Sequence, residues 1–184
     1  MKKCGKLFVI SGPSGVGKNT LIEKFLLQNP DVKLSISNTT RKPRAGEIDG
    51  VNYFFTQWQD FLDAVKNNEF LEWAEFGGNC YGTKQAYVEK KLDEGSDLIL
   101  EIDTQGAMQI KAKIPEAVLI FVMPPSLEAL EKRLRGRQTE SEEAIQTRLA
   151  AAKRELETAG KFDYQIVNDD LEQAVIGLQS LFRL

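Results

Sequence analysis

A glycine-rich stretch near the N-terminus has the residue types and the spacing that bind phosphate groups. It follows an apolar run at residues 7–10, which we expect to form a buried strand, and it precedes a segment with the apolar spacing of a helix. Glycines let successive backbone N–H groups point at phosphate oxygens, the helix N-terminus adds its positive dipole end, and a lysine supplies a mobile cation. We therefore predict a phosphate-binding loop that holds a nucleotide. Its residues are Gly12, Pro13, Ser14, Gly15, Val16, Gly17, Lys18, Asn19 and Thr20.

One residue of this loop departs from the usual pattern. The position after the lysine is normally Ser or Thr, whose hydroxyl binds Mg²⁺, but here it is Asn19. An amide oxygen can also bind Mg²⁺, which is strict about its octahedral geometry, and Thr20 faces about 100° away along the helix. Asn19 could therefore weaken metal binding, act through water or mark an impaired enzyme.

A second candidate phosphate site lies in the region of residues 38–81, which is rich in glycine and aromatic residues. Arg41 and Arg44 are three residues apart in a proline-containing loop, and arginine grips phosphate through two parallel hydrogen bonds. Tyr53 and Tyr81 lie in the same region and could donate their hydroxyls to the same phosphate. A pair of loop arginines taken alone is equally consistent with solvated surface.

The composition restricts the chemistry. The 184 residues suit a single compact domain, and a net charge of −3 gives no basic field for nucleic acid or membrane. The chain has no histidine, the commonest general base and zinc ligand, but phosphoryl transfer relies more on positioning and charge neutralisation. Two cysteines, no signal-peptide pattern and no apolar run of membrane-spanning length make the cytoplasm the expected location.

Short apolar strands alternate with helical segments along most of the chain. We expect strands at residues 33–37, 97–103, 117–123 and 164–167. We also expect Ser126 to cap a helix at residues 127–135, and Thr139 and Glu142 to form a capping box before a long helix. Such alternation predicts an α/β fold with a mostly parallel sheet flanked by helices, with ligands at the carboxyl ends of the strands. Glu101 and Asp103 lie at one such strand end and face the same way.

Several runs, taken together and in order, resemble the guanylate kinase family over nearly the whole chain. Beyond the loop at 12–20 they are Thr39-Thr40-Arg41-Lys42-Pro43-Arg44-Ala45-Gly46-Glu47, Asn79-Cys80-Tyr81-Gly82-Thr83, Glu101-Ile102-Asp103-Thr104-Gln105-Gly106, Pro124-Pro125-Ser126 and Val167-Asn168-Asp169-Asp170. The resemblance implies a P-loop NTPase type of fold in one domain of residues 1–184. The core would comprise residues 1–34, 95–135 and 160–184. An inserted mixed α/β subdomain at about residues 35–94 would bind GMP, and a short lid would lie at about residues 136–159.

The resemblance also implies roles for individual residues. The GMP phosphate would be bound by Arg41, Arg44, Tyr53 and Tyr81, and the guanine edge by Ser37, Glu72, Thr83 and Asp103. ATP would be bound by the loop at 12–20 with Arg133, Arg137 and Asn168, and catalysis would use Lys18, Arg41, Arg133, Arg137 and Arg148. Mg²⁺ would accompany ATP, with Asn19, and Glu101 or Asp103 through water, as candidate metal contacts.

The expected reaction is transfer of the γ-phosphate of ATP to GMP, giving ADP and GDP. One alternative is a guanylate-kinase-like binding module with weak or no catalysis because of Asn19, although Lys18 and the lid arginines argue against it. Another is a kinase for a different monophosphate, against which Glu72 argues because a carboxylate accepts the paired donors of guanine. The expected partners are ATP and GMP, without nucleic acid or membrane, in a monomer or homodimer.

Overall fold

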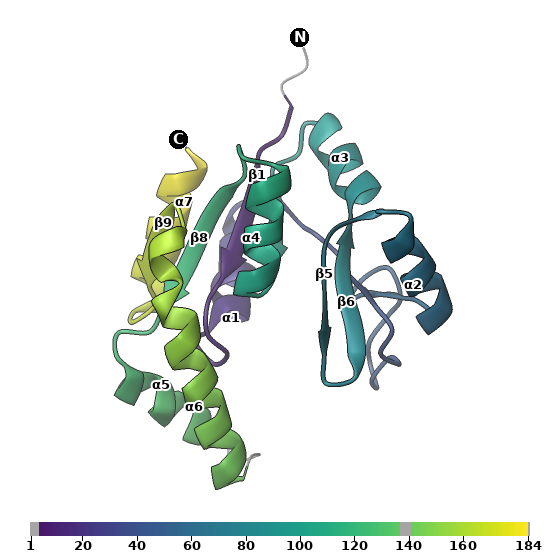
Figure 1. Ribbon diagram of the computed structural model, residues 1–184. Helices are drawn as coiled ribbons and strands as arrows, with labels where there is room; N and C mark the ends of the chain where they lie inside the picture. Colours follow the sequence, from purple (N-terminus) through teal and green to yellow (C-terminus); the bar gives the residue numbers. More distant parts are fainter. Residues whose placement is uncertain (1–3, 137–140, 184) are drawn as a thin grey trace. The chain divides into compact units, whose positions relative to one another are not determined.

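The computed structural model describes residues 4–136 and 141–183 and contains two β-sheets (Figure 1). The larger sheet has five strands in the order β2-β7-β1-β8-β9, and its β2–β7 and β8–β9 pairs are parallel. It is the mostly parallel, helix-flanked sheet that the sequence predicts. Its strands are β1 Leu7–Ser11, β2 Lys33–Leu34, β7 Leu98–Glu101, β8 Val118–Met123 and β9 Tyr164–Val167.

The chain divides into two compact units. One comprises the residues up to Phe8, Asp31–Leu100 and Gln105–Ala117, and the other comprises Val9–Pro30, Glu101–Thr104 and the residues from Val118 onward. We refer to them as the acceptor unit and the loop unit. The predicted boundaries of core, inserted subdomain and lid stay a prediction.

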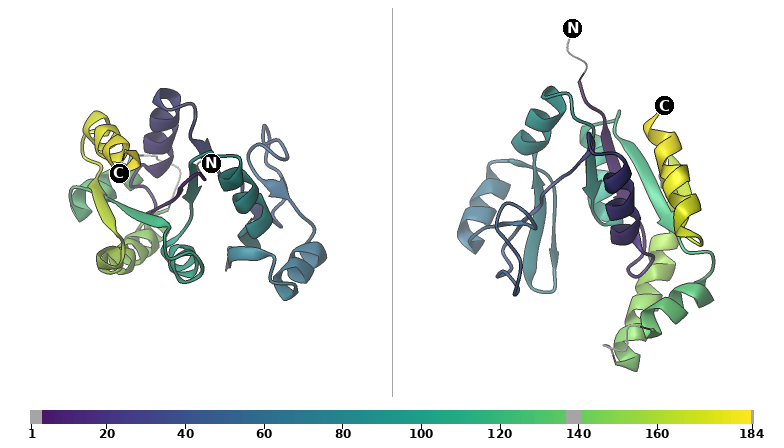
Figure 2. Two further views of the ribbon diagram at one scale, coloured as in Figure 1. Left: turned by 90° about the horizontal axis from the view of Figure 1, so that it is seen from above. Right: turned by 180° about the vertical axis from the view of Figure 1, so that it is seen from behind.

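The loop unit is built around the phosphate loop. β1 is apolar and buried along its length, and it leads directly into the glycines that precede α1 (Lys18–Gln28). α1 lies beside the last helix, α7 (Leu171–Phe182), in both views of Figure 2, and the rings of Phe25 and Phe182 are 4.6 Å apart between centroids. A short 3₁₀ turn, η1 (Ala159–Lys161), precedes β9.

Two capped helices complete the loop unit. The Ser126 hydroxyl accepts a hydrogen bond from the Ala129 N–H at the start of α5 (Leu127–Arg135), as predicted for this serine. The next helix, α6 (Glu142–Glu157), lies beside α5 and is capped by Ser141. The predicted capping box at Thr139 is therefore wrong: the helix begins two residues later than that box requires, and Thr139 itself lies outside the described residues.

The acceptor unit contains the second sheet, with strands in the order β4-β3-β6-β5. A small apolar cluster of Phe61, Ala64, Phe70 and Cys80 holds α2 against this sheet. Besides β2 and most of β7, the unit contains β3 Asn38–Thr39, β4 Phe54–Phe55, α2 Trp58–Lys66, β5 Phe70–Phe76, β6 Asn79–Lys84, α3 Gln85–Asp93 and, from its second residue onward, α4 Thr104–Lys113.

Only the first two residues of the predicted strand at residues 33–37 form a strand, and the next strand, which begins at residue 38, belongs to the other sheet. β2 pairs with β7 only through Lys33 and Leu34, with one further hydrogen bond from the Ser35 N–H to the Ile99 carbonyl. The chain then enters the smaller sheet, where the Ser37 carbonyl accepts from the Phe54 N–H. No helix in the described ranges is both long and apolar enough to cross a membrane.

Candidate nucleotide-binding site

The phosphate loop has the backbone that its glycines predict. Gly12 has a φ of +147°, and a Cβ atom there would lie 2.3 Å from the Val122 carbonyl oxygen, so a side chain cannot fit. Lys18 Nζ donates hydrogen bonds to the carbonyls of Gly12 at 2.5 Å and Pro13 at 3.2 Å. The lysine thus folds back over its own loop, with its ammonium group on the carbonyls of Gly12 and Pro13.

Two distant residues brace this loop at the carbonyl of Val16. Asn168 follows β9 and is buried, and its Nδ2 donates to the Val16 oxygen at 2.9 Å. Arg133 on α5 donates to the same oxygen at 3.2 Å and to the Asn168 carbonyl at 2.8 Å. These contacts hold the backbone of the loop at Val16 from two other elements of the unit.

Carboxylates surround the loop lysine. Burial lowers the pKa of Lys18, although the negative charges of Glu101 and Glu155 oppose that shift. Burial likewise raises the pKa of Glu101, against the attraction of Lys18, and raises the pKa of Glu155 on α6. Nucleotide phosphates in the loop would favour the charged form of Lys18.

Oxygen donors at this end of the sheet fit a metal ion that accompanies a nucleotide. Asn19 presents an exposed amide at the first turn of α1, and the Glu101 carboxylate ends β7. Mg²⁺ usually takes one or two protein oxygens and completes its shell with phosphates and water, so this donor set is compatible with it. Asp103 lies beyond the end of β7 and is exposed, so the expectation that it shares a strand face with Glu101 is wrong.

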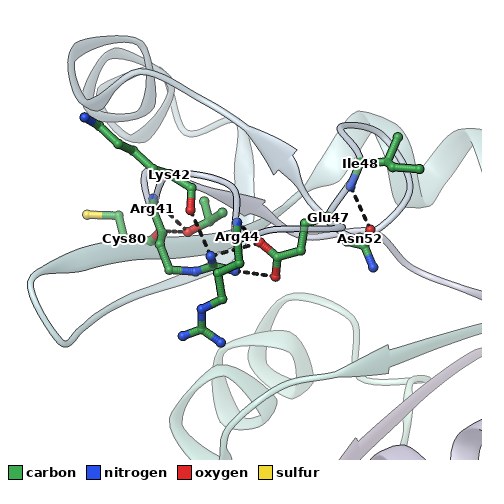
Figure 3. Close-up of polar contacts among 8 residues, drawn as sticks. Arg41, Lys42, Arg44, Glu47, Ile48, Asn52 and Cys80 are labelled. Carbon is green, nitrogen blue, oxygen red and sulfur yellow. Dashed lines mark hydrogen bonds and ion pairs between the residues drawn. The ribbon is translucent and has the colours of Figure 1, made fainter.

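The acceptor unit presents Arg41 in a fixed orientation (Figure 3). Its Nη1 and Nη2 donate to the two carboxylate oxygens of Glu47 at 3.0 and 2.8 Å, and Nη1 also donates to the Lys42 carbonyl at 2.9 Å. The Arg44 N–H donates to the same carboxylate at 2.7 Å. These bonds fix the plane of the Arg41 guanidinium, whose planar fork is the geometry that suits a phosphate.

The two predicted tyrosines lie beside this arginine. The Arg41 guanidinium carbon is 5.4 Å from the centre of the Tyr53 ring, which is 6.1 Å from the ring of Tyr81. Hydrogen bonding to Glu47 raises the pKa of Arg41, and Tyr81 adds a smaller contribution in the same direction. The same ion pair lowers the pKa of Glu47 to about 2. The cluster is therefore charged throughout the physiological pH range.

A buried carboxylate lies on the neighbouring strands. The side chain of Glu72 on β5 is 5% exposed, and its Oε1 accepts a hydrogen bond of 2.6 Å from the Thr83 hydroxyl on β6. The two residues are directly opposite each other in the strand register. A buried charge needs hydrogen-bonding partners, and the Thr83 hydroxyl supplies one of them.

The predicted site residues separate by unit. Arg137 lies outside the described residues. Arg148, half-buried on α6, belongs to the loop unit. The acceptor unit holds Ser37, Arg41, Arg44, Tyr53, Glu72, Tyr81 and Thr83, and the loop unit holds Gly12 to Thr20, Glu101, Asp103, Arg133 and Asn168.

Comparison with known proteins agrees with this arrangement. The sequence profile described as guanylate kinase matches residues 4–183. The chain belongs to the guanylate kinase family. A guanylate kinase from Desulfitobacterium hafniense (strain Y51) is 51% identical over 177 residues, covering 96% of this chain and 88% of the relative. A guanylate kinase from Synechococcus sp. (strain CC9311) is 51% identical over 176 residues, covering 96% of this chain and 93% of the relative.

A solved structure gives the same result for the fold. The crystal structure of guanylate kinase from Anaplasma phagocytophilum matches with a TM-score of 0.76 at 34% identity, covering 99% of this chain and 86% of that one. With this match and the helix-flanked parallel sheet, the fold is the α/β fold of P-loop NTPases, as predicted.

The sequence of this guanylate kinase family member does not predict the contacts of two further residues, Glu47 and Glu155. Glu47, which pairs with Arg41, lies in one of the family motifs, but the five residues of irregular loop between the two give no periodic signal. Glu155, whose charge reaches Lys18, lies on α6 far along the sequence, among other charged helical residues. The family motif around Glu47 could have indicated a role for that residue, whereas nothing in the sequence marks Glu155.

Proposed function

We propose that this chain transfers the γ-phosphate of ATP to GMP and releases ADP and GDP. The observation that carries the proposal is the family match over residues 4–183. The geometry supports it, because the acceptor unit pairs an arginine fork at Arg41 with a buried carboxylate at Glu72, as an acceptor with a phosphate and a base requires.

The loop unit would bind the donor. The backbone of the loop and Lys18 hold the β- and γ-phosphates, while Arg133 and Asn168 keep the loop in shape through the Val16 carbonyl. Arg148, with Arg137, would neutralise charge on the transferring phosphoryl group, as lid arginines do in such reactions. Transfer is in line between two clamped phosphates, so we expect no covalent intermediate.

The acceptor unit would bind GMP. Arg41, Arg44, Tyr53 and Tyr81 would hold its phosphate. Glu72, supported by Thr83, would accept hydrogen bonds from the guanine N1–H and N2–H₂ groups. Adenine lacks this pair of donors and would leave a buried carboxylate poorly satisfied, which is the kind of mismatch that gives strong discrimination.

Two further contacts to the guanine edge belong to the proposal. Ser37 lies half-buried next to β3 in the acceptor unit, and Asp103 follows β7 in the loop unit. Family members are ATP-using kinases that generally need a divalent metal. Mg²⁺ with ATP is the proposed ion, and Asn19 and Glu101 are the proposed protein contacts. When bound, Mg²⁺ would neutralise charge on the β- and γ-phosphates. A cytoplasmic location and a monomeric or homodimeric state stay predictions.

A coupled assay of ADP formation tests the reaction. GMP, AMP, UMP and dTMP are offered in turn as acceptors with ATP and millimolar Mg²⁺, and we expect turnover with GMP far above that with the other three. No turnover with GMP would overturn the enzyme assignment and favour a binding module. Equal turnover with AMP would overturn the guanine assignment while leaving a nucleotide kinase.

A further inference from the structure

The strand that carries Glu72 is held along its outer edge by two side chains of α4. β5 is the last strand of the four-stranded sheet, so only one of its edges pairs with β6. An edge strand leaves a row of backbone N–H and C=O groups without a strand partner. Gln109 and Lys113 meet this row, and they are four residues apart and so on one face of the helix.

Gln109 makes a two-way contact with one residue of β5. Its Oε1 accepts a hydrogen bond from the Trp73 N–H at 3.3 Å, and its Nε2 donates to the Trp73 carbonyl at 3.2 Å. Lys113 Nζ donates to the Phe70 carbonyl at 2.8 Å. A carboxamide carries the same donor and acceptor as a peptide group, so Gln109 stands in for one residue of a neighbouring strand.

These contacts bracket Glu72 at an irregular point of the sheet. Phe70 pairs with Lys84 and Glu72 with Thr83, so the register shifts by one residue between them. Such a bulge disrupts the strand ladder locally and re-aims the side chains beside it. The anchored residues, Phe70 and Trp73, lie on either side of Glu72. The side chains of α4 therefore hold β5 at the bulge, where its pairing with β6 is irregular.

We propose that Gln109 is a positioning residue for the acceptor base. Through the backbone of Trp73 it holds β5 so that the Glu72 carboxylate is aimed at the guanine edge. The inference rests on the proposed role of Glu72 and adds a specificity determinant outside the binding pocket. Because Gln109 acts on the acceptor unit, its loss affects GMP binding and base selectivity and leaves ATP binding unchanged.

The test compares Gln109→Ala with a matched control, Gln59→Ala, in the full chain. Gln59 is also a helical glutamine of the acceptor unit, exposed where Gln109 is half-buried, and its carboxamide donates to Asp63 within its own helix. We expect Gln109→Ala to raise the KM for GMP roughly fivefold to tenfold, the effect of losing one or two hydrogen bonds, with the KM for ATP at the wild-type value. Selectivity for GMP over AMP falls as well, and the control behaves like wild type.

Two further measurements separate positioning from general damage. Amide hydrogen exchange at Trp73 becomes faster in Gln109→Ala, because its N–H loses its acceptor. Gln109→Glu keeps that acceptor but loses the donor, so its KM for GMP falls between wild type and Gln109→Ala. If Gln109→Ala does not fold, the KM for GMP of Gln109→Glu tests the inference by itself.

The outcomes distinguish the inference from the function on which it rests. Absence of GMP turnover in the wild type would overturn the proposed function and the inference together. Wild-type turnover with an unchanged KM for GMP in both Gln109 variants would overturn the inference alone. A KM for ATP that rises as much as that for GMP would also overturn it, because the defect would then be general.

Discussion

The hydroxyl of Thr83 donates a hydrogen bond of 2.6 Å to the buried carboxylate of Glu72, directly across the strand pair. This bond joins the proposed guanine contact, Glu72, to the neighbouring strand β6. A threonine in this position does two things: it satisfies one lone pair of a buried charge, and it limits the directions in which the carboxylate can point.

Thr83→Val should weaken both stability and recognition. Valine keeps the shape of the side chain but removes the donor, so we expect a loss of about 1–3 kcal/mol in the free energy of unfolding and roughly a tenfold rise in the KM for GMP. Thr83→Ser is the control, because it keeps the hydroxyl. Chemical denaturation and steady-state kinetics measure the two effects, and a valine variant equal to wild type in both would contradict the role given to this bond.

The pair formed by Arg41 and Glu47 should show no pH dependence in the range where the enzyme works. Because Arg41 lowers the pKa of Glu47 from 4.5 to about 2, the pair stabilises the fold fully above pH 4.5, and its contribution is lost as the pH falls toward 2. We expect Glu47→Gln to raise the KM for GMP about threefold to tenfold, by the same factor from pH 6 to pH 9.

Denaturation of wild type and Glu47→Gln between pH 2 and pH 7 checks the sign of this effect. The difference in unfolding free energy between them should be constant above pH 4.5 and shrink below it. Glu75→Gln, at an exposed carboxylate on β5, serves as the control. A difference that grows as the pH falls would show that the ion pair does not stabilise the folded state.

The brace at Val16 should matter for the donor nucleotide. Asn168→Ala removes the buried amide that donates to the Val16 carbonyl, so we expect a loss of about 1–2 kcal/mol in stability and a several-fold rise in the KM for ATP. Asn29→Ala is a matched control, since Asn29 also donates to a backbone carbonyl, that of Phe25, away from the loop. A rise in the KM for ATP in both variants would contradict a specific effect on the loop.

Gly17 and Gly46 isolate the contribution of close packing from that of backbone conformation. Their φ angles are +95° and +86°, but a Cβ at Gly17 would lie 2.7 Å from Asn168 Nδ2, whereas nothing lies within 4 Å at Gly46. Alanine at either position costs about 1 kcal/mol in backbone strain. We expect Gly17→Ala to lose clearly more stability than Gly46→Ala, measured by thermal unfolding, and to raise the KM for ATP. Equal losses would mean that Asn168 moves aside freely.

Local patterns explain what the sequence predicts well. The phosphate loop is recognisable because its glycines, its lysine and the flanking apolar strand are adjacent in the chain, and the structure confirms the strand and the helix on either side. The predicted serine cap of α5 has the same local origin. In each case the physical cause lies within a few residues of the feature.

Contacts between distant backbone atoms explain what could not be predicted. The brace from Arg133 ends on a main-chain oxygen 117 residues away, and a carbonyl has no signature in the sequence. The predicted strand at residues 33–37 is wrong for a related reason. Its alternating pattern of residues continues across the point where the chain passes from one sheet to the other. Periodicity describes which side chains are buried, but it does not say which strand is the neighbour.

The role proposed for Asn19 predicts that this residue affects how strongly the reaction depends on the metal. The residue is exposed at the first turn of α1, where a hydroxyl would normally meet Mg²⁺. We expect Asn19→Ser to lower the Mg²⁺ concentration that gives half-maximal activity roughly tenfold, the scale on which single changes near a metal alter its affinity. Asn19→Ala removes the oxygen altogether and should raise that concentration. Titration of Mg²⁺ at saturating ATP and GMP measures both, and identical titrations for all three proteins would show that position 19 does not contact the metal.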